Sequence, residues 1–179
     1  MTSTPKRLLI AASGTGGHLF PAIATASQLT SGPAEVEIEW LGVPDRLETQ
    51  LVPRQYPLHT IKVQGFQKPL GLNTFRTAGR LVAAILEVRR LLKTQKFDGV
   101  LTTGGYIAGP SILAARSLGL PTILHESNAL PGKVTRWLSP WCSQVAIGFD
   151  AAASYLPKAV TFCVGTPVRP EFYPPVTAA

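Results

Sequence analysis

Glycine-rich and polar residues follow three separate apolar runs of the 179-residue sequence. They are Ser13-Gly14-Thr15-Gly16-Gly17-His18, residues 102–110 (TTGGYIAGP) and residues 125–133 (HESNALPGK). Glycines let backbone amides approach a phosphate closely, and the N-terminus of a following helix adds partial positive charge. The first two loops therefore predict a shared phosphate-binding crevice. The third offers polar side chains that could recognise a hydroxylated ligand.

Several familiar chemistries do not fit these loops. The dinucleotide fingerprint GxGxxG fails because Leu19 stands at its sixth position, and the second apolar run ends at Gly42 without an acid. The sequence has no GxxxxGK[ST] P-loop and no GxSxG nucleophile elbow. Adjacent residues such as His125, Glu126 and Ser127 cannot form a Ser–His–acid relay. A tight turn without a ligand, and a cap formed by Asn128, remain alternatives.

Composition and charge narrow the choice of partner. The chain is 45% hydrophobic and 15% charged, as in a globular protein of one domain. Its net charge is +7, and nine Lys and Arg residues between positions 51 and 97 face only one acid, Glu87. A concentrated basic stretch favours phosphates on nucleic acid, lipid or substrate. No nucleic-acid recognition motif accompanies it, so we expect no nucleic-acid partner.

The three loops need a scaffold that brings their ends together. Alternating apolar and helical stretches predict an α/β fold, a Rossmann-like open parallel sheet with helices on both faces. Ligands bind at the carboxyl ends of such strands. The strands are expected at 7–12, 35–41, 57–63, 98–103, 121–125, 144–149 and 159–164, and the helices at 18–30, 44–53, 72–94, 106–118, 131–140 and 149–156. The alternating glutamates of 35–41 predict that one face of this strand is exposed to water and that the strand lies near an edge of the sheet. The two cysteines are expected to be buried and reduced.

No targeting or membrane-spanning segment is expected. The first apolar run ends after five residues at a glycine loop, below the roughly 7–15 residues of a signal-peptide core. The run at 81–86 (LVAAIL) is far shorter than the about 20 residues that cross a bilayer.

Four motifs together resemble a known family. GTGGHLFPA, GGYIAGP, HESNALPGKVTRWLS and VGTPVR, in this order, look like the amino-terminal domain of the MurG family of N-acetylglucosaminyltransferases. Ser13, Ser127 and Thr166 depart from the glycine, glutamine and asparagine usual there. The resemblance implies one half of a GT-B fold. Residues 1–164 would be an acceptor- and membrane-binding domain and 165–179 an interdomain hinge, with the carboxyl-terminal donor domain absent.

The resemblance also implies a reaction. GlcNAc would pass from UDP-GlcNAc to the C4 hydroxyl of undecaprenyl-pyrophosphoryl-MurNAc-pentapeptide, with inversion, in peptidoglycan biosynthesis. The protein would lie peripherally on the cytoplasmic side of the bacterial plasma membrane, need no metal or other cofactor, and be inactive without the donor domain. The alternatives are a non-catalytic membrane-docking subunit of a split glycosyltransferase and another GT-B glycosyltransferase.

Individual residues take roles from this resemblance. A hydroxyl nucleophile gains from a positioned general base, and imidazole titrates near neutral pH, so His18 is the first candidate base and His125 the alternative. A purely orienting or capping role for His18 stays open. The UDP-GlcNAc cleft would be lined by Thr15, Gly16, Gly17, Asn128 and Arg169, and the acceptor side by Gly14, Gly104, Gly105, Tyr106, His125 and Glu126.

Apolar and basic residues interleave at 66–80, as suits the surface of an anionic membrane. The expected membrane contacts are Phe66, Lys68, Leu72, Phe75, Arg76 and Arg80, and Trp137, Trp141, Lys133 and Arg136 could add to them. Most of Leu81, Val82, Ile85, Leu86, Val88 and Leu92 are expected to face the core.

Overall fold

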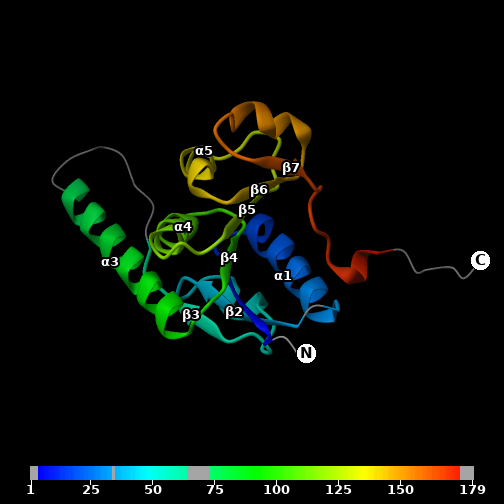
Figure 1. Cartoon of the computed structure of the whole chain (residues 1–179), viewed down its shortest axis with the longest axis horizontal. Coiled ribbons are helices and arrows are strands. Elements are labelled where there is room, and N and C mark those ends of the chain that lie inside the picture. The colour runs from blue at the N-terminus through cyan, green and yellow to red at the C-terminus, as the bar shows by residue number, and fades with distance from the viewer. Residues whose placement is uncertain (1–3, 34, 64–72, 174–179) are drawn as a thin grey trace, which may run out of the picture.

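The computed structural model describes residues 4–33, 35–63 and 73–173 (Figure 1). These residues form a seven-stranded parallel sheet with the strand order β3-β2-β1-β4-β5-β6-β7. The strands are β1 (Lys6–Ala11), β2 (Val36–Gly42), β3 (Leu58–Thr60), β4 (Gly99–Thr102), β5 (Thr122–Glu126), β6 (Gln144–Ile147) and β7 (Thr161–Cys163). All seven expected strands are present, and the Rossmann-like parallel sheet is confirmed. The order reverses between β1 and β4, where a doubly wound sheet opens its ligand crevice.

Helices cover both faces of the sheet, as predicted (Figure 1). The α-helices are α1 (Gly16–Ser31), α2 (Glu48–Leu51), α3 (Asn73–Thr94), α4 (Ala108–Ser117) and α5 (Lys133–Leu138), and the 3₁₀ helices are η1 (Ser139–Trp141), η2 (Asp150–Tyr155) and η3 (Pro170–Phe172). The helix expected at 44–53 is a single turn, and the stretch expected at 149–156 is a 3₁₀ helix. Proline at 53 fits the early end of α2, because proline disfavours the α conformation in the residue before it.

The period-two alternation of β1 divides the core between the two faces. Leu9 and Ala11 pack with side chains of α3 and α4, while Ile10 and Ala12 pack with side chains of α1. Both faces are apolar because a parallel sheet with helices on each side has no wet face. The indole Nε1 of Trp40 donates to the carbonyl of Ala12 at 3.0 Å, so this large core residue keeps its polar atom bonded.

The glutamate face of β2 is only partly wet. β2 lies second from the edge of the sheet, between β1 and β3. The side chain of Glu39 is only 12% exposed. It forms an ion pair with Arg7, and its Oε2 lies 2.5 Å from Nε2 of His59. Glu37 also pairs with Arg7, at 3.4 Å. Neighbouring strands therefore cover Glu39, whereas Glu35 and Glu37 are exposed, as the alternation predicted.

The expectation that both cysteines are buried is wrong for Cys163, which is exposed at β7, a strand at the edge of the sheet. Cys142 is partly buried, and this burial raises the pKa of its thiol to about 12. No helix among the described residues is long and apolar enough to cross a bilayer.

Candidate active site

The loops after β1 and β4 meet at the switch point of the sheet. The hydroxyl of Thr102 donates to the carbonyl of Ala11 at 2.8 Å, which ties the ends of the two strands together. Thr103 follows, and its hydroxyl donates to the backbone carbonyl of His18 at 2.8 Å. The two glycine-rich loops are thus in direct contact, as the sequence predicted for a shared crevice.

His18 stands at this junction, half-buried in the first turns of α1. Its Nδ1 lies 2.6 Å from the backbone oxygen of Thr103. A carbonyl oxygen only accepts, so Nδ1 carries the proton of the neutral ring. Nε2 then keeps its lone pair, and none of the described residues forms a hydrogen bond with it. The arrangement orients one nitrogen and leaves the other able to take a proton from a ligand.

Gly104 and Gly105 form the wall beside this imidazole. Their φ angles are +98° and +76°, a region that side chains disfavour. A Cβ on Gly104 would lie 3.2 Å from Cε1 of His18. A Cβ on Gly105 would lie 3.2 Å from the carbonyl oxygen of Ser13 and 3.9 Å from Nε2 of His18. The positive φ angles favour glycine at both positions, and an added Cβ would crowd the His18 ring at Gly104 and the Ser13 carbonyl at Gly105. The exposed side chain of Tyr106 comes next.

A buried acid, Glu48, holds the first glycine loop and was not anticipated from the sequence. Its carboxylate is fully buried and accepts from the amide of Val43 at 2.6 Å and from that of Gly14 at 3.4 Å. A Cβ on Gly42 would lie 2.6 Å from Cγ of Glu48, so that glycine makes room for the acid. The amide of Gly14 is therefore occupied by a carboxylate within the protein. The one sequence feature related to this packing is Gly42, the glycine at the end of the second apolar run.

Thr15, Gly16 and Gly17 begin α1. Thr15 is the N-cap, and its carbonyl accepts from the amides of His18 and Leu19. Thr15 and Gly17 are exposed. The first amides of a helix have no acceptor within the helix, so this turn presents N–H groups and partial positive charge beside His18.

The loop after β5 is organised by Glu126, a buried residue. Its Oε1 accepts from the backbone amide of Asn128 at 3.0 Å and from the Nδ2 of the same residue at 2.7 Å. Its Oε2 accepts from the amide of Gly132, the N-cap of α5, at 3.3 Å. Asn128 itself is exposed, and its Oδ1 is the atom that it can offer a ligand as an acceptor.

His125 has both ring nitrogens engaged. The residue is 5% exposed, and Nε2 lies 3.0 Å from the backbone oxygen of Gly165. That contact requires a proton on Nε2, and Nδ1 lies 3.4 Å from the hydroxyl of Ser127, from which it accepts in the neutral ring. Of the two candidate bases, His18 is the one with a ring nitrogen not engaged by the described residues.

Comparison with known proteins agrees with this architecture. Residues 8–147 match the model of the glycosyltransferase family 28 N-terminal domain. The chain belongs to this family. The predicted resemblance to MurG is confirmed, because the crystal structure of Acinetobacter baumannii MurG superposes with a TM-score of 0.77 at 33% identity. That match covers 90% of this chain and 46% of the MurG chain.

A curated relative from Trichormus variabilis is 67% identical over 172 residues, which are 96% of this chain and 47% of that protein. It is named UDP-N-acetylglucosamine–N-acetylmuramyl-(pentapeptide) pyrophosphoryl-undecaprenol N-acetylglucosamine transferase. This chain thus spans about half the length of the curated relatives it matches. The structure of a UDP-N-acetylglucosamine 2-epimerase from Rickettsia bellii superposes with a TM-score of 0.61 at 17% identity. The match covers 91% of this chain and 45% of the epimerase chain, and it shows the fold alone.

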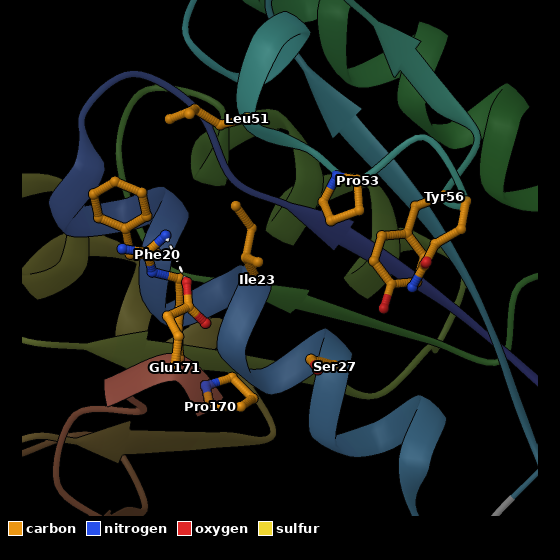
Figure 2. Close-up of a pocket in the computed structure, with 10 residues that line it drawn as sticks. Phe20, Ile23, Ser27, Leu51, Pro53, Tyr56, Pro170 and Glu171 are labelled. Atoms are coloured by element: carbon orange, nitrogen blue, oxygen red, sulfur yellow. Dashed lines mark ion pairs between the residues drawn. The ribbon is translucent and has the colours of Figure 1, made fainter. Parts of the chain in front are cut away.

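Residues 165–173 of this chain fold back along α1 (Figure 1). The guanidinium of Arg169 lies 4.4 Å from the ring centre of Phe20 and 4.9 Å from that of Phe172. It also pairs with Glu171 at 3.0 Å. Figure 2 shows Phe20, Pro170 and Glu171 along a groove of about 350 Å³ beside α1. Arg169 is therefore attached to the helix that carries His18.

The expected membrane contacts fall mostly outside the described side chains. Phe66, Lys68 and Leu72 lie outside the described residues, and the side chains of Phe75 and Arg76 are not described either. Arg80 is exposed on α3. Farther along α3, Val88 and Leu92 are buried, as expected, and Leu81 and Ile85 are partly buried. Val82 and Leu86 are instead 55% and 58% exposed.

Proposed function

We propose that this chain is the acceptor- and membrane-binding half of a GT-B N-acetylglucosaminyltransferase that uses UDP-GlcNAc and undecaprenyl-pyrophosphoryl-MurNAc-pentapeptide. The observation that carries the proposal is the position of His18 at the junction of the two glycine loops, where Nδ1 contacts the Thr103 carbonyl and Nε2 has no hydrogen-bond partner among the described residues. The names of the Trichormus and Acinetobacter relatives support this substrate class. The boundary between a domain at 1–164 and a hinge at 165–179 is part of the proposal.

In the proposed reaction, His18 acts as general base on the C4 hydroxyl of the muramoyl sugar. The hydroxyl oxygen attacks the anomeric carbon of GlcNAc, and the bond from that carbon to the phosphate oxygen breaks as UDP leaves. The hydroxyl proton passes to Nε2, and attack from the face opposite UDP inverts the anomeric centre. The carbonyl of Thr103 keeps Nδ1–H in place and stabilises the resulting imidazolium, a task that carboxylates perform in catalytic triads.

The other loop residues would position the two substrates. Thr15, Gly16 and Gly17 would present helix amides toward the nucleotide sugar, and Asn128 would offer Oδ1. The Arg169 guanidinium lies close to two aromatic rings and its Nη1 pairs with Glu171, but its other N–H groups would still bind a phosphate oxygen. Gly104, Gly105 and Tyr106 would line the acceptor side, with Gly14, His125 and Glu126 holding the loops in shape.

Membrane association is proposed through the outer face of α3. Val82 and Leu86 lie one turn apart and are exposed, and the exposed Arg90 and Lys93 follow on the same helix. Exposed apolar groups next to cations suit the surface of an anionic leaflet. The protein would therefore bind peripherally to the cytoplasmic side of the bacterial plasma membrane, where its lipid-linked acceptor would be presented.

Vesicle co-sedimentation tests this surface. The V82S/L86S variant should lose most binding to phosphatidylglycerol vesicles, while V160S, a change at a 66% exposed valine before β7, should bind as the parent does. Equal binding by all three proteins would remove α3 from the membrane contact. High salt should weaken parental binding, because the cationic contribution is screened.

A transfer assay tests the activity itself. We would fuse this chain to the carboxyl-terminal half of the Trichormus relative and supply radiolabelled UDP-GlcNAc with the lipid-linked muramoyl acceptor. The fusion should form the disaccharide lipid, and the chain alone should not. A folded fusion that binds vesicles without transferring sugar would favour the docking-subunit alternative. Transfer to a different lipid acceptor alone would favour another GT-B glycosyltransferase.

A further inference from the structure

The buried histidine after β5 contacts the segment that leads out of the sheet. His125 lies at the carboxyl end of β5 and is 5% exposed, while Gly165 follows the last strand, 40 positions later. The 3.0 Å contact between Nε2 and the Gly165 oxygen joins these two parts of the chain. Leaving the N–H group of so buried a ring without an acceptor would cost free energy. We propose that His125 is a positioning residue that fixes the interdomain hinge, rather than a base.

The backbone at the contact supports this role. Gly165 has a φ of +72°, so the chain turns sharply there in a conformation that favours glycine. The next residue packs closely as well, because a Cβ on Gly148 would lie 2.8 Å from the hydroxyl oxygen of Thr166. The turn is therefore held from two sides, by the β5 end through His125 and by the β6 end through Gly148.

A second attachment lies four residues farther along the hinge. Arg169 stacks on Phe20 of α1 at 4.4 Å. The Phe20 ring in turn lies against Gly16, where a Cβ would be 2.7 Å from the ring. The hinge is thus tied both to β5 and to the glycine-loop end of the helix that carries His18. The direction in which the chain leaves this half is set relative to His18.

This inference rests on the proposed function for its catalytic consequence, but the attachment itself can be measured separately. In a two-domain transferase, the hinge determines where the donor half sits over the acceptor. Loss of the His125 contact should therefore lower kcat through misplacement of the two substrates. It should leave the pH dependence of the remaining activity unchanged, because His125 gives and takes no proton in the reaction.

Three substitutions of His125, by Gln, Asn and Leu, distinguish positioning from general disruption. Gln places its amide nitrogen near the position of Nε2, whereas Asn places it near Nδ1 and cannot reach the Gly165 oxygen. Hydrogen exchange of the 179-residue chain, followed in peptides that span 164–173, should rise about tenfold in H125N and H125L and stay near the parental rate in H125Q. Equal exchange in all four proteins would overturn the attachment, and so would a rise in H125Q matching that in H125N.

The fusion protein tests the catalytic consequence. H125N should lower kcat at least about tenfold, H125Q should restore most of it, and both should keep the parental pH profile. A loss of the acid limb of the profile in H125Q would instead make His125 the base and overturn the proposal. If the parental fusion transfers no sugar, the proposed function fails, while the exchange experiment still decides whether His125 holds the hinge.

Discussion

His18 and Thr103 are joined by two reciprocal hydrogen bonds. The ring Nδ1 of His18 donates to the Thr103 carbonyl at 2.6 Å, and the Thr103 hydroxyl donates to the His18 carbonyl at 2.8 Å. One residue belongs to the first turns of α1 and the other follows β4, so the pair locks together the two loops at the switch point of the sheet. The geometry fixes the tautomer of the imidazole and the direction of its remaining nitrogen.

Adding a methyl group at Gly104 should lower activity as well as stability, because the group would crowd His18 in addition to straining the backbone. G104A pays about 1–2 kcal/mol for its positive φ and also places Cβ 3.2 Å from His18. G119A is the matched control, because Gly119 has a φ of +70° with nothing within 4 Å of the added Cβ. Thermal unfolding should show a loss in both variants. Activity of the fusion protein should fall in G104A alone, and an equal fall in G119A would argue against crowding of His18.

Removing the buried carboxylate of Glu48 should destabilise the first glycine loop. E48A leaves the amides of Val43 and Gly14 without their acceptor, at a cost of about 3 kcal/mol in the free energy of unfolding. E35A removes the same charge at an exposed position and should change stability by less than about 0.5 kcal/mol. Urea unfolding measures both. Similar midpoints for the two variants would mean that Glu48 does not support the loop.

Much of this site follows from the sequence because its signals are local. Glycines after short apolar runs marked the switch point, and the parallel strands brought the loops of His18 and Gly104 together as expected. Glu48 could not be predicted, since a lone acid in a short polar helix is ordinarily exposed. The engagement of both His125 nitrogens depends on Gly165, which only the folded chain brings near. Likewise, Glu39 is covered because β3 adds an outer strand carrying His59.

Asp98 should make stability depend on pH in the acid range. The backbone amide of Arg7 and the Lys6 ammonium lower the pKa of the Asp98 carboxyl below its ordinary 3.8. Folding therefore favours the ionised form, so the stabilisation is complete above about pH 4 and is lost as pH falls through the lower folded pKa. The difference in melting temperature between parent and D98N should be present at pH 7 and shrink near pH 2. D150N, at an exposed aspartate in η2, controls for net charge.

The two thiols should react at very different rates. Burial raises the pKa of Cys142 to about 12, so its thiolate is scarce at pH 8, whereas Cys163 is exposed. Brief treatment of the folded protein with iodoacetamide should add one label, at Cys163, as read by mass spectrometry. C163S should take up almost none, and C142S should label as the parent does. Rapid labelling of Cys142 in the folded chain would contradict its burial.

The pH–rate profile of His18 variants tests the central claim most directly. In the fusion protein, H18A should lower kcat by about 10²–10⁴-fold and remove the acid limb of the profile, because the proton acceptor is gone. H59A, which removes a partly exposed histidine on β3, should keep both the rate and the profile. A folded H18A fusion with near-parental kcat and an unchanged acid limb would contradict the assignment of His18 as the base.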